Sequence, residues 1–347
     1  MASNDEDDLG ASEELEKVKP NLQSWSVPDL TNIVQEGRFR RILIAGVSGY
    51  IGSALALGLR DEYEIVGTYY DHPVRIEGVT CIKMNCLMGG EILSALTRFN
   101  PDLVVYCVGL NSTDHCEEAP AIAEALNFRA PAIFFKVLPK PVPFVYFGSD
   151  VIFGDPKKAP FKESDKPKSL NTLALTKQKG EAMVFNHSRL TYVFRLPAVY
   201  GETLGSIQYP RASWLRWLQR QLDKGEKVSL YKDQFRSSIY VGDVVRAFRK
   251  FLVKAPLKSS LLHIAPSVGQ SRYEFGKLFC REFDYDENLL MESSINDNPE
   301  TTIPRPKDIR LSGKIFEDIY KFTAQGPEEG LKEMAERLRT GYLKGWP

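Results

Sequence analysis

A glycine-rich turn is the clearest chemical feature of the sequence. The stretch Gly46-Val47-Ser48-Gly49-Tyr50-Ile51-Gly52 follows the apolar run RILIA and precedes a second apolar run, SALALGL. Glycines let a backbone turn tightly against a pyrophosphate, and the N–H groups at a helix N-terminus attract its charge. Because the turn joins an expected strand to an expected helix, it predicts a dinucleotide site formed by Gly46, Ser48, Gly49, Tyr50, Ile51 and Gly52. The alternative is a turn that serves only the fold.

The residues after the second expected strand bear on which dinucleotide binds. They read GTYYDHP, with no acid at the end of the strand, although Asp71 lies just beyond it. An acid here would bind the ribose 2′-hydroxyl of NAD, whereas an arginine such as Arg75 suits the 2′-phosphate of NADP. Asp71 is therefore a candidate cofactor ligand, and NAD and NADP both stay open. Either charge could equally be an exposed loop residue.

Short apolar runs alternate with helical segments from Arg40 to Gly201. Strands are expected in RILIA, YEIVGTYY, VTCIKMNC, DLVVYCVG, VPFVYFGSD and LTYVFRLPAVYG, and helices in GGEILSALTRFNP, APAIAEALNFRAPAIFFKVL and SLNTLALTKQKGEAMVFNHS. This alternation predicts an α/β fold of Rossmann type, with a doubly wound parallel sheet covered by helices on both faces.

The alternation loosens after Gly201, where a smaller, discontinuous C-terminal lobe is expected. The stretch ASWLRWLQRQLDKGE predicts an amphipathic helix with Trp214, Trp217 and Leu218 on its apolar side. We therefore divide the chain into an acidic N-terminal extension at 1–38, a Rossmann domain at 39–200 with returning segments about 226–266, and a substrate-type lobe at 201–225 and 267–347.

The extension is polar and acidic, with Pro20 and Pro28 as breaks. A short helix is expected over VPDLTNIVQEG. The extension is either a loosely docked tail or an arm that binds a protein partner through Trp25 and Leu30.

Composition excludes several classes of function. The 45 Lys and Arg balance 45 Asp and Glu, so no overall field favours nucleic acid or an anionic membrane. No apolar run reaches the ~20 residues of a membrane helix, and the acidic first residues are unlike a secretory signal. Five cysteines without paired spacing and four scattered histidines predict no metal site. We expect a cytoplasmic protein, and a homo-oligomer is left open.

Four further stretches resemble the dTDP-4-dehydrorhamnose reductases of the extended short-chain dehydrogenase/reductase superfamily. YFGSDVIFGD is similar to their S-T-D-Y-V-F segment, and ESDKPKSLNTLALTKQKGE to E-x-D-x-P-x-x-x-x-x-Y-G-x-x-K-x-x-G-E. FRSSIYVGDVV resembles R-D-F-I-Y-V-D-D-V, and RPKDIRLSGKIF resembles R-P-x-x-x-x-L-x-x-x-K with its lysine one residue early. The resemblance runs from about Arg40 to the C-terminus, and it extends to the regulatory beta subunits of methionine adenosyltransferase.

The resemblance implies reduction of a ketone on a nucleotide sugar by hydride from NAD(P)H. In that family a serine or threonine holds the carbonyl oxygen and a tyrosine delivers the proton. A lysine one helical turn later lowers the tyrosine pKa and binds the nicotinamide ribose. Ser149 and Lys177 match the first and last of these positions, but Leu173 stands where the tyrosine is expected. Loss of that acid should cost roughly 10²–10⁴-fold in rate.

Other departures from the family pattern concern the same place. Tyr106 stands where a small polar residue is usual, Val151 replaces the tyrosine after the serine–aspartate pair, and Ala174 replaces a glycine. Because the glycine turn is kept, this contrast favours a cofactor-bound regulatory or scaffold protein, a pseudoenzyme with impaired or absent reductase chemistry. Lys177 would then act as a ribose ligand.

Two other readings of the resemblance stay open. The chain could be an active reductase or epimerase of a nucleotide sugar, with water or Tyr106, or else Tyr146 or Tyr200, as the proton source. It could also be a structural pseudoenzyme without cofactor. Arg236 matches an arginine that binds a sugar-nucleotide phosphate, so Arg236 and Tyr106 are candidate substrate ligands. Asn127 matches an asparagine that steadies the active site in relatives.

Overall fold

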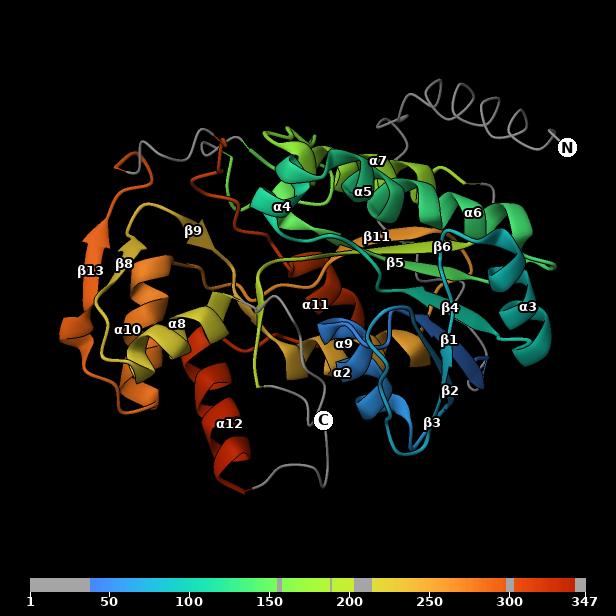
Figure 1. The fold of residues 1–347 in the computed structure, drawn as a ribbon, viewed down its shortest axis with the longest axis horizontal. Helices are drawn as coiled ribbons and strands as arrows, with labels where there is room; N and C mark the ends of the chain where they lie inside the picture. The colour runs from blue at the N-terminus through green and yellow to red at the C-terminus, as the bar shows by residue number, and fades with distance from the viewer. Residues whose placement is uncertain (1–37, 155–157, 188, 203–213, 298–302, 341–347) are drawn as a thin grey trace, which may run out of the picture.

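The main feature of the computed structural model is one sheet of seven parallel strands, in the order β11-β6-β5-β4-β1-β2-β3 (Figure 1). The model describes residues 38–154, 158–187, 189–202, 214–297 and 303–340. The strands are β1 (Arg41–Ala45), β2 (Glu64–Tyr69), β3 (Val79–Lys83), β4 (Leu103–Tyr106), β5 (Phe144–Ser149), β6 (Thr191–Leu196) and β11 (Ser260–His263). The predicted α/β fold with a doubly wound parallel sheet is confirmed.

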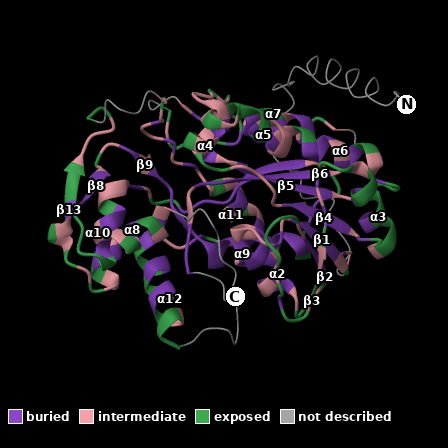
Figure 2. Ribbon diagram, viewed as in Figure 1, coloured by how far each residue is buried: buried purple, intermediate pink, exposed green. Residues whose placement is uncertain are grey.

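Helices cover both faces of this sheet, which explains why its central strands are apolar throughout rather than alternating. On one face lie α2 (Tyr50–Leu59), α9 (Val241–Val253) and α11 (Lys314–Tyr320), whose apolar side chains join one core cluster. On the other lie α3 (Gly89–Phe99), α6 (Ala130–Val137) and α7 (Thr172–Phe185), which belong to a second cluster. Figure 2 shows the central strands β4, β5 and β6 between them as almost entirely buried.

The segment expected as one long helix before β5 is divided into several pieces. It comprises α4 (Thr113–Glu118), α5 (Pro120–Glu124), a π-helical turn η2 (Ala125–Arg129) and α6. The turn packs closely on α7, because a Cβ atom at Gly180 would lie 2.0 Å from the carbonyl oxygen of Asn127. The extra residue of the π turn therefore lies at a tight helix–helix contact, a type of distortion that is frequent near functional sites.

The smaller lobe is built from α8 (Trp214–Asp223), α10 (Arg272–Glu282) and α12 (Pro327–Thr340), with three two-stranded sheets. The pairs are β8 (Val228–Tyr231) with β13 (Leu290–Ser293), β9 (Phe235–Arg236) with β12 (Gln270–Ser271), and β7 (Val199–Tyr200) with β10 (Ile239–Tyr240). Figure 1 places β8, β13, α8 and α10 together at the end of the molecule away from α3.

Two contacts bear on the predicted division between the sheet domain and this lobe. Residues about 226–266 were expected to return to the Rossmann domain, but β8 at their start pairs with β13. Leu230 of β8 is buried against α10, where a Cβ at Gly276 would approach it to 2.4 Å. Conversely, α11 lies in the range assigned to the lobe, yet its Phe316 ring stacks edge-on against Phe194 of β6, at 6.4 Å between centroids. Within 226–266, α9 packs on the large sheet, β11 joins it, and β10 pairs with β7.

The apolar side of α8 also differs from the prediction. Leu215, Leu218 and Leu222 are buried, whereas Trp217 is 40% exposed. The spacing of the three leucines defines the buried stripe, and Trp217 lies outside it. Trp217 was therefore wrongly assigned to the core.

Two further expectations concern the N-terminal extension and membrane-spanning helices. The helix predicted over VPDLTNIVQEG and nearly all of the extension lie outside the described residues. Within the described ranges, no helix is both long and apolar enough to cross a bilayer.

Candidate cofactor and substrate cleft

A cleft of about 1060 Å³ lies where the carboxyl ends of β4, β5 and β6 face the smaller lobe. It brings together most of the residues that the sequence singled out, from elements far apart in the chain. Its lining includes Gly49, Tyr50, Ile51, Tyr106, Ser149, Leu173, Lys177 and Arg236. Ligands of open α/β sheets bind at this edge, beyond the carboxyl ends of the strands.

The glycine turn forms one end of this cleft. Gly46 has a φ of +85°, in the left-handed region, and a Cβ at Gly52 would lie 2.3 Å from the Gly46 carbonyl oxygen. The turn is therefore closed on itself in a way that only glycine permits. At the N-terminus of α2, Gly49 supplies no side-chain cap, and the first turn carries no acidic residue. These features fit a bound pyrophosphate, whose charge the helix N-terminus would stabilise.

The candidate residues for the adenosine ribose lie apart from the cleft lining. Asp71 and Arg75 are both exposed and follow the end of β2 at Tyr69. Neither residue is held by a described ion pair.

Lys177 lies in the middle of α7 and is only 5% exposed. Its Nζ atom lies against Gly109 at the end of β4, where a Cβ would come within 2.9 Å, and 5.9 Å from the Tyr146 ring centroid. Burial lowers the pKa of the Lys177 amine to about 8. Among the described residues no carboxylate pairs with it, so its polar end is available to a ligand in the cleft.

Leu173 lies one turn before Lys177 and is 4% exposed. Its side chain belongs to a small apolar cluster with Cys116 and Ala123, and Leu110 and Val151 pack against this cluster. Burial raises the pKa of the Cys116 thiol to about 11, so this group is no readily ionised acid either. The part of the cleft wall next to Lys177 is therefore apolar.

Ser149 and Asp150 end β5 and begin the short helix η3 (Asp150–Ile152). The Ser149 hydroxyl donates to Asp150 Oδ1 at 3.1 Å and accepts from the Val151 N–H at 3.3 Å. Asp150 is 3% exposed, and its Oδ2 has no hydrogen-bond partner among the described residues. Burial raises the pKa of the Asp150 carboxyl to about 6, against the opposing effect of the nearby Arg236 guanidinium.

Guanidinium groups form the wall that faces Asp150. Arg236 of β9 is 7% exposed, and its Nε lies 3.9 Å from Asp150 Oδ2. Arg272, at the start of α10, lies over the Trp214 ring at 4.5 Å. Burial, together with the charge of Arg236, lowers the pKa of Arg272 to about 9. Arg305 also lines the cleft and pairs with Asp114 at 2.5 Å. Asp150 attracts both guanidinium groups, whereas Asp308, which also attracts Arg236, is itself paired with Arg310. Arg236 and Arg272 together therefore carry an excess of positive charge.

The three tyrosines that could have replaced the missing acid all donate to main-chain carbonyls. The hydroxyl of Tyr106 donates to Leu126 at 2.6 Å, that of Tyr146 to Asn127 at 3.0 Å, and that of Tyr200 to Pro327 at 3.3 Å. Each ring is buried, and burial raises the pKa of each phenol. The ring of Tyr106 packs among Phe134, Phe144 and Tyr146. Its position argues against the roles of proton donor and substrate ligand that the sequence suggested.

Asn127 fixes the loop after β4 onto α7. Its Oδ1 accepts from the Leu110 N–H at 3.1 Å, and its Nδ2 donates to the Leu110 carbonyl at 3.1 Å and to Thr176 Oγ1 at 3.0 Å. These bonds position the loop beside Lys177.

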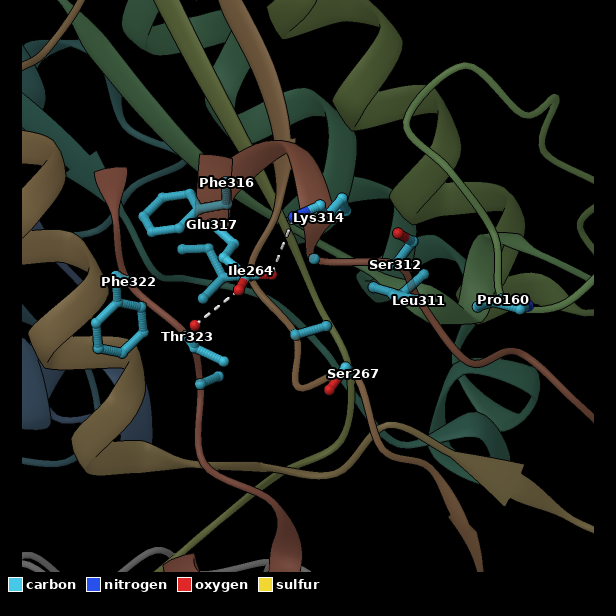
Figure 3. A pocket seen from close by; sticks show the side chains of 13 residues that line it. Pro160, Ile264, Ser267, Leu311, Ser312, Lys314, Phe316, Glu317, Phe322 and Thr323 are labelled. Atoms are coloured by element: carbon cyan, nitrogen blue, oxygen red, sulfur yellow. Dashed lines mark hydrogen bonds and ion pairs between the residues drawn. The ribbon is translucent and has the colours of Figure 1, made fainter. Parts of the chain in front are cut away.

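Two other locations were considered as sites. Among the described residues, no three His, Cys, Asp or Glu side chains lie close enough to hold a metal ion. A second pocket, of about 200 Å³, lies beside α11 and is lined by Ile264, Ala265, Leu311 and Phe316 among others (Figure 3). It contains none of the predicted site residues.

Sequence reasoning did not single out Asp150 and Arg272. Asp150 appears in the motif only as the neighbour of Ser149, and Arg272 lies inside a helix-capping pattern, between Ser271 and Glu274. Their place in the site depends on burial and on the approach of β9 and α10, which no local pattern encodes.

The seven-stranded sheet, the glycine turn and the two-lobed cleft are those of the extended short-chain dehydrogenase/reductase type. Residues 40–340 match the model of the RmlD substrate binding domain family, and the chain belongs to that family.

Its relatives carry different roles. The chain is 25% identical over 275 residues to the probable low-salt glycan biosynthesis reductase Agl14 of Haloferax volcanii, covering 76% of this chain and 87% of that protein. It is 25% identical over 258 residues to methionine adenosyltransferase 2 subunit beta of Danio rerio, covering 73% of this chain and 77% of that protein.

Solved structures show the same fold. The dTDP-4-dehydrorhamnose reductase of Bacillus anthracis in complex with NADP superposes with a TM-score of 0.70 at 17% identity, over 85% of this chain and 98% of that one. MoeE5 in complex with UDP-glucuronic acid and NAD gives a TM-score of 0.70 at 21% identity, over 87% of this chain and 99% of that one.

Proposed function

We propose that this chain binds NAD(P) and a nucleotide sugar in the cleft, and that its reductase chemistry is impaired because Leu173 occupies the position of the tyrosine acid. The protein then acts as a regulatory or scaffold subunit. The observation that carries the proposal is the contrast between the two ends of one site. The glycine turn and Lys177 are suited to a cofactor, whereas Leu173 lies in an apolar cluster.

The cofactor end would hold a dinucleotide through two contacts. The N-terminus of α2 and the closed glycine turn would bind the pyrophosphate. Lys177 would donate to the nicotinamide ribose, because its amine is buried, faces the cleft and lacks a carboxylate partner among the described residues. A bound nicotinamide would supply hydride for carbonyl reduction. The solved relatives with NAD or NADP support this assignment.

The substrate end would bind the phosphates of a nucleotide sugar. Arg236 and Arg272 both line the cleft, and Asp150 is the carboxylate that attracts both of them. A diphosphate would neutralise the excess charge and accept several charge-assisted hydrogen bonds from the guanidinium forks. MoeE5, with UDP-glucuronic acid bound, supports a ligand of this class.

Between the two ends, the proton donor is missing. In the family pattern a phenol at position 173 would stand one turn before Lys177, whose charge would lower the phenol's pKa. Leucine can neither donate a proton nor bind the developing alkoxide. Reduction at neutral pH should therefore be slower by roughly 10²–10⁴-fold than in a chain with the phenol.

A regulatory role is supported by the kind of relative that the chain resembles. Methionine adenosyltransferase 2 subunit beta is, by its name, one subunit of a larger enzyme. A partner for this chain could bind the N-terminal extension, and comparison of the full chain with a deletion of residues 1–38 in a pull-down would locate that contact.

The experiment that tests the proposal is a fluorescence titration with NADH and NADPH, followed by addition of dTDP-4-dehydrorhamnose. Saturable binding of one cofactor with little oxidation is the expected result. No binding at millimolar cofactor would contradict the cofactor role, and fast oxidation would contradict the impaired chemistry. Arg236→Met should weaken binding of the nucleotide sugar but leave cofactor binding unchanged.

A further inference from the structure

The carboxyl of Asp150 has so far been given only an electrostatic role, opposite Arg236 at 3.9 Å, yet its environment is unusual. It is almost fully buried at the cleft, its Oδ1 accepts the Ser149 hydroxyl at 3.1 Å, and its Oδ2 has no hydrogen-bond partner among the described residues. A buried polar atom left unsatisfied is costly, and such atoms call for a physical explanation. A carboxylic acid that keeps a proton in part of the population would reduce this cost.

We propose that Asp150 and Ser149 form a proton relay that drives the slow carbonyl reduction remaining without the tyrosine. The inference rests on the proposed binding of NAD(P) and a nucleotide sugar, and it concerns the same cleft. Ser149 touches the substrate carbonyl, and Asp150 acts through Ser149.

The hydrogen bonds around Ser149 suit a relay. Its Oγ accepts from the Val151 N–H at 3.3 Å, and a hydroxyl oxygen has a second lone pair. When Asp150 is protonated on Oδ1, that second lone pair can accept the Asp150 proton across the same 3.1 Å separation. The Ser149 hydrogen is then released to point into the cleft and donate to a carbonyl oxygen.

The balance of the step is simple. As hydride from NAD(P)H forms the new C–H bond and the carbonyl π bond breaks, the Ser149 proton passes to the oxygen and the Asp150 proton passes to Ser149 Oγ. The products are the alcohol, NAD(P)⁺ and an Asp150 carboxylate, which takes up a proton from water before the next turnover. One hydride and one proton are consumed for each ketone reduced.

The charged groups around Asp150 set the pH at which the relay works. Arg236 from β9 and Arg272 from α10 favour its carboxylate form, Ser149 of β5 donates to it, and Lys177 lies on α7, which packs against η3. Burial outweighs these effects and raises the Asp150 pKa to about 6.

The sign of the pH dependence follows. The acid form is the active one, so turnover is greatest below the Asp150 pKa and falls as the pH rises through it. With a pKa near 6, the protonated fraction falls about 50-fold between pH 6 and pH 8.

The test measures NADPH oxidation with dTDP-4-dehydrorhamnose from pH 5 to 8, after correction for cofactor decay without protein. Parent, Asp150→Asn, Ser149→Ala and Ser149→Thr are compared, with Asp318→Asn on α11 as a distant carboxylate control. We expect the parent and Asp318→Asn to lose about 50-fold between pH 6 and 8. Asp150→Asn and Ser149→Ala should be at least tenfold slower at pH 5.5 without this slope, and Ser149→Thr should retain it.

A second readout does not depend on turnover. Infrared difference spectra of the cofactor-free chain should show a protonated carboxyl band that appears below about pH 6 and is missing in Asp150→Asn. Equal rates and slopes for the parent and Asp150→Asn would overturn the relay, as would absence of turnover at pH 5.5 in protein that binds both ligands. Failure to bind either ligand would instead refute the proposed function itself. If Asp150→Asn does not fold, Ser149→Ala carries the same prediction.

Discussion

Restoring a phenol at position 173 is the most informative single change in this molecule. Leu173 lines the cleft and lies one turn before Lys177, so a tyrosine there can extend its hydroxyl into the open volume. Its ring must share the space of Cys116 and Ala123, which are buried beside Leu173. Overpacking of this kind costs about 1–3 kcal/mol of folding free energy, which a domain of this size can tolerate.

The gain expected from Leu173→Tyr is large because one group changes from inert to acidic. A positioned acid is worth roughly 10²–10⁴-fold in rate. The Lys177 amine next to it would favour the phenolate that forms as the proton leaves. We expect single-turnover oxidation of NADPH by dTDP-4-dehydrorhamnose at pH 7.5 to rise by that factor over the parent.

The control for this variant lies on the same helix. Leu175 is 47% exposed and lies outside the cleft lining, so Leu175→Tyr changes composition equally without reaching the site. Its rate should equal that of the parent. If Leu173→Tyr binds both ligands and still reacts no faster than Leu175→Tyr, then the lack of an acid at position 173 does not limit the rate of reduction, and the reasoning is wrong.

Three further predictions concern stability and cofactor binding. Lys177→Met should stabilise the fold by about 2–3 kcal/mol at pH 7, because the buried amine has a folded pKa of about 8, below its unfolded value, but the variant should bind NADPH more weakly. For the same reason the parent should lose stability as the pH falls from about 10 to 8, which urea unfolding at both pH values checks. Glu181→Gln should cost about 3–5 kcal/mol in the same assay, because it leaves the fully buried Arg195 without its 2.6 Å ion pair; an unchanged midpoint would contradict this. Gly52→Ala should weaken NADPH binding at least tenfold, since its Cβ would meet the turn at 2.3 Å, whereas Gly90→Ala, with open space around its Cβ, should bind as the parent does.

The fold could be predicted from the sequence because the patterns that indicate strands and helices are local and repeat along the chain. Apolar strands alternating with helices have few solutions other than a parallel sheet covered on both faces, and the structure has that sheet. The errors arose where a distant partner decides the outcome. Trp217 is apolar but lies off the leucine stripe of α8, and β8 pairs with β13 rather than returning to the large sheet. Neither outcome depends on local pattern alone.

The site shows the same division. The family resemblance implied that Ser149, Leu173 and Lys177 share one site, and the structure places all three in the cleft lining. Asp150 and Arg272 gained their significance only from burial and from the approach of other elements. Tyr106 shows the converse: its type and position suggested chemistry, but its hydroxyl is bonded to Leu126 in the core.

The central claim, a site that holds cofactor without its proton donor, is tested most directly by one recording. NADPH fluorescence is followed while the full chain is titrated in, and dTDP-4-dehydrorhamnose is then added in excess at pH 7.5. The account predicts a saturable rise on binding, followed by a loss at least 10²-fold slower than in Leu173→Tyr. A parent chain that oxidises its bound NADPH as fast as that variant would contradict it.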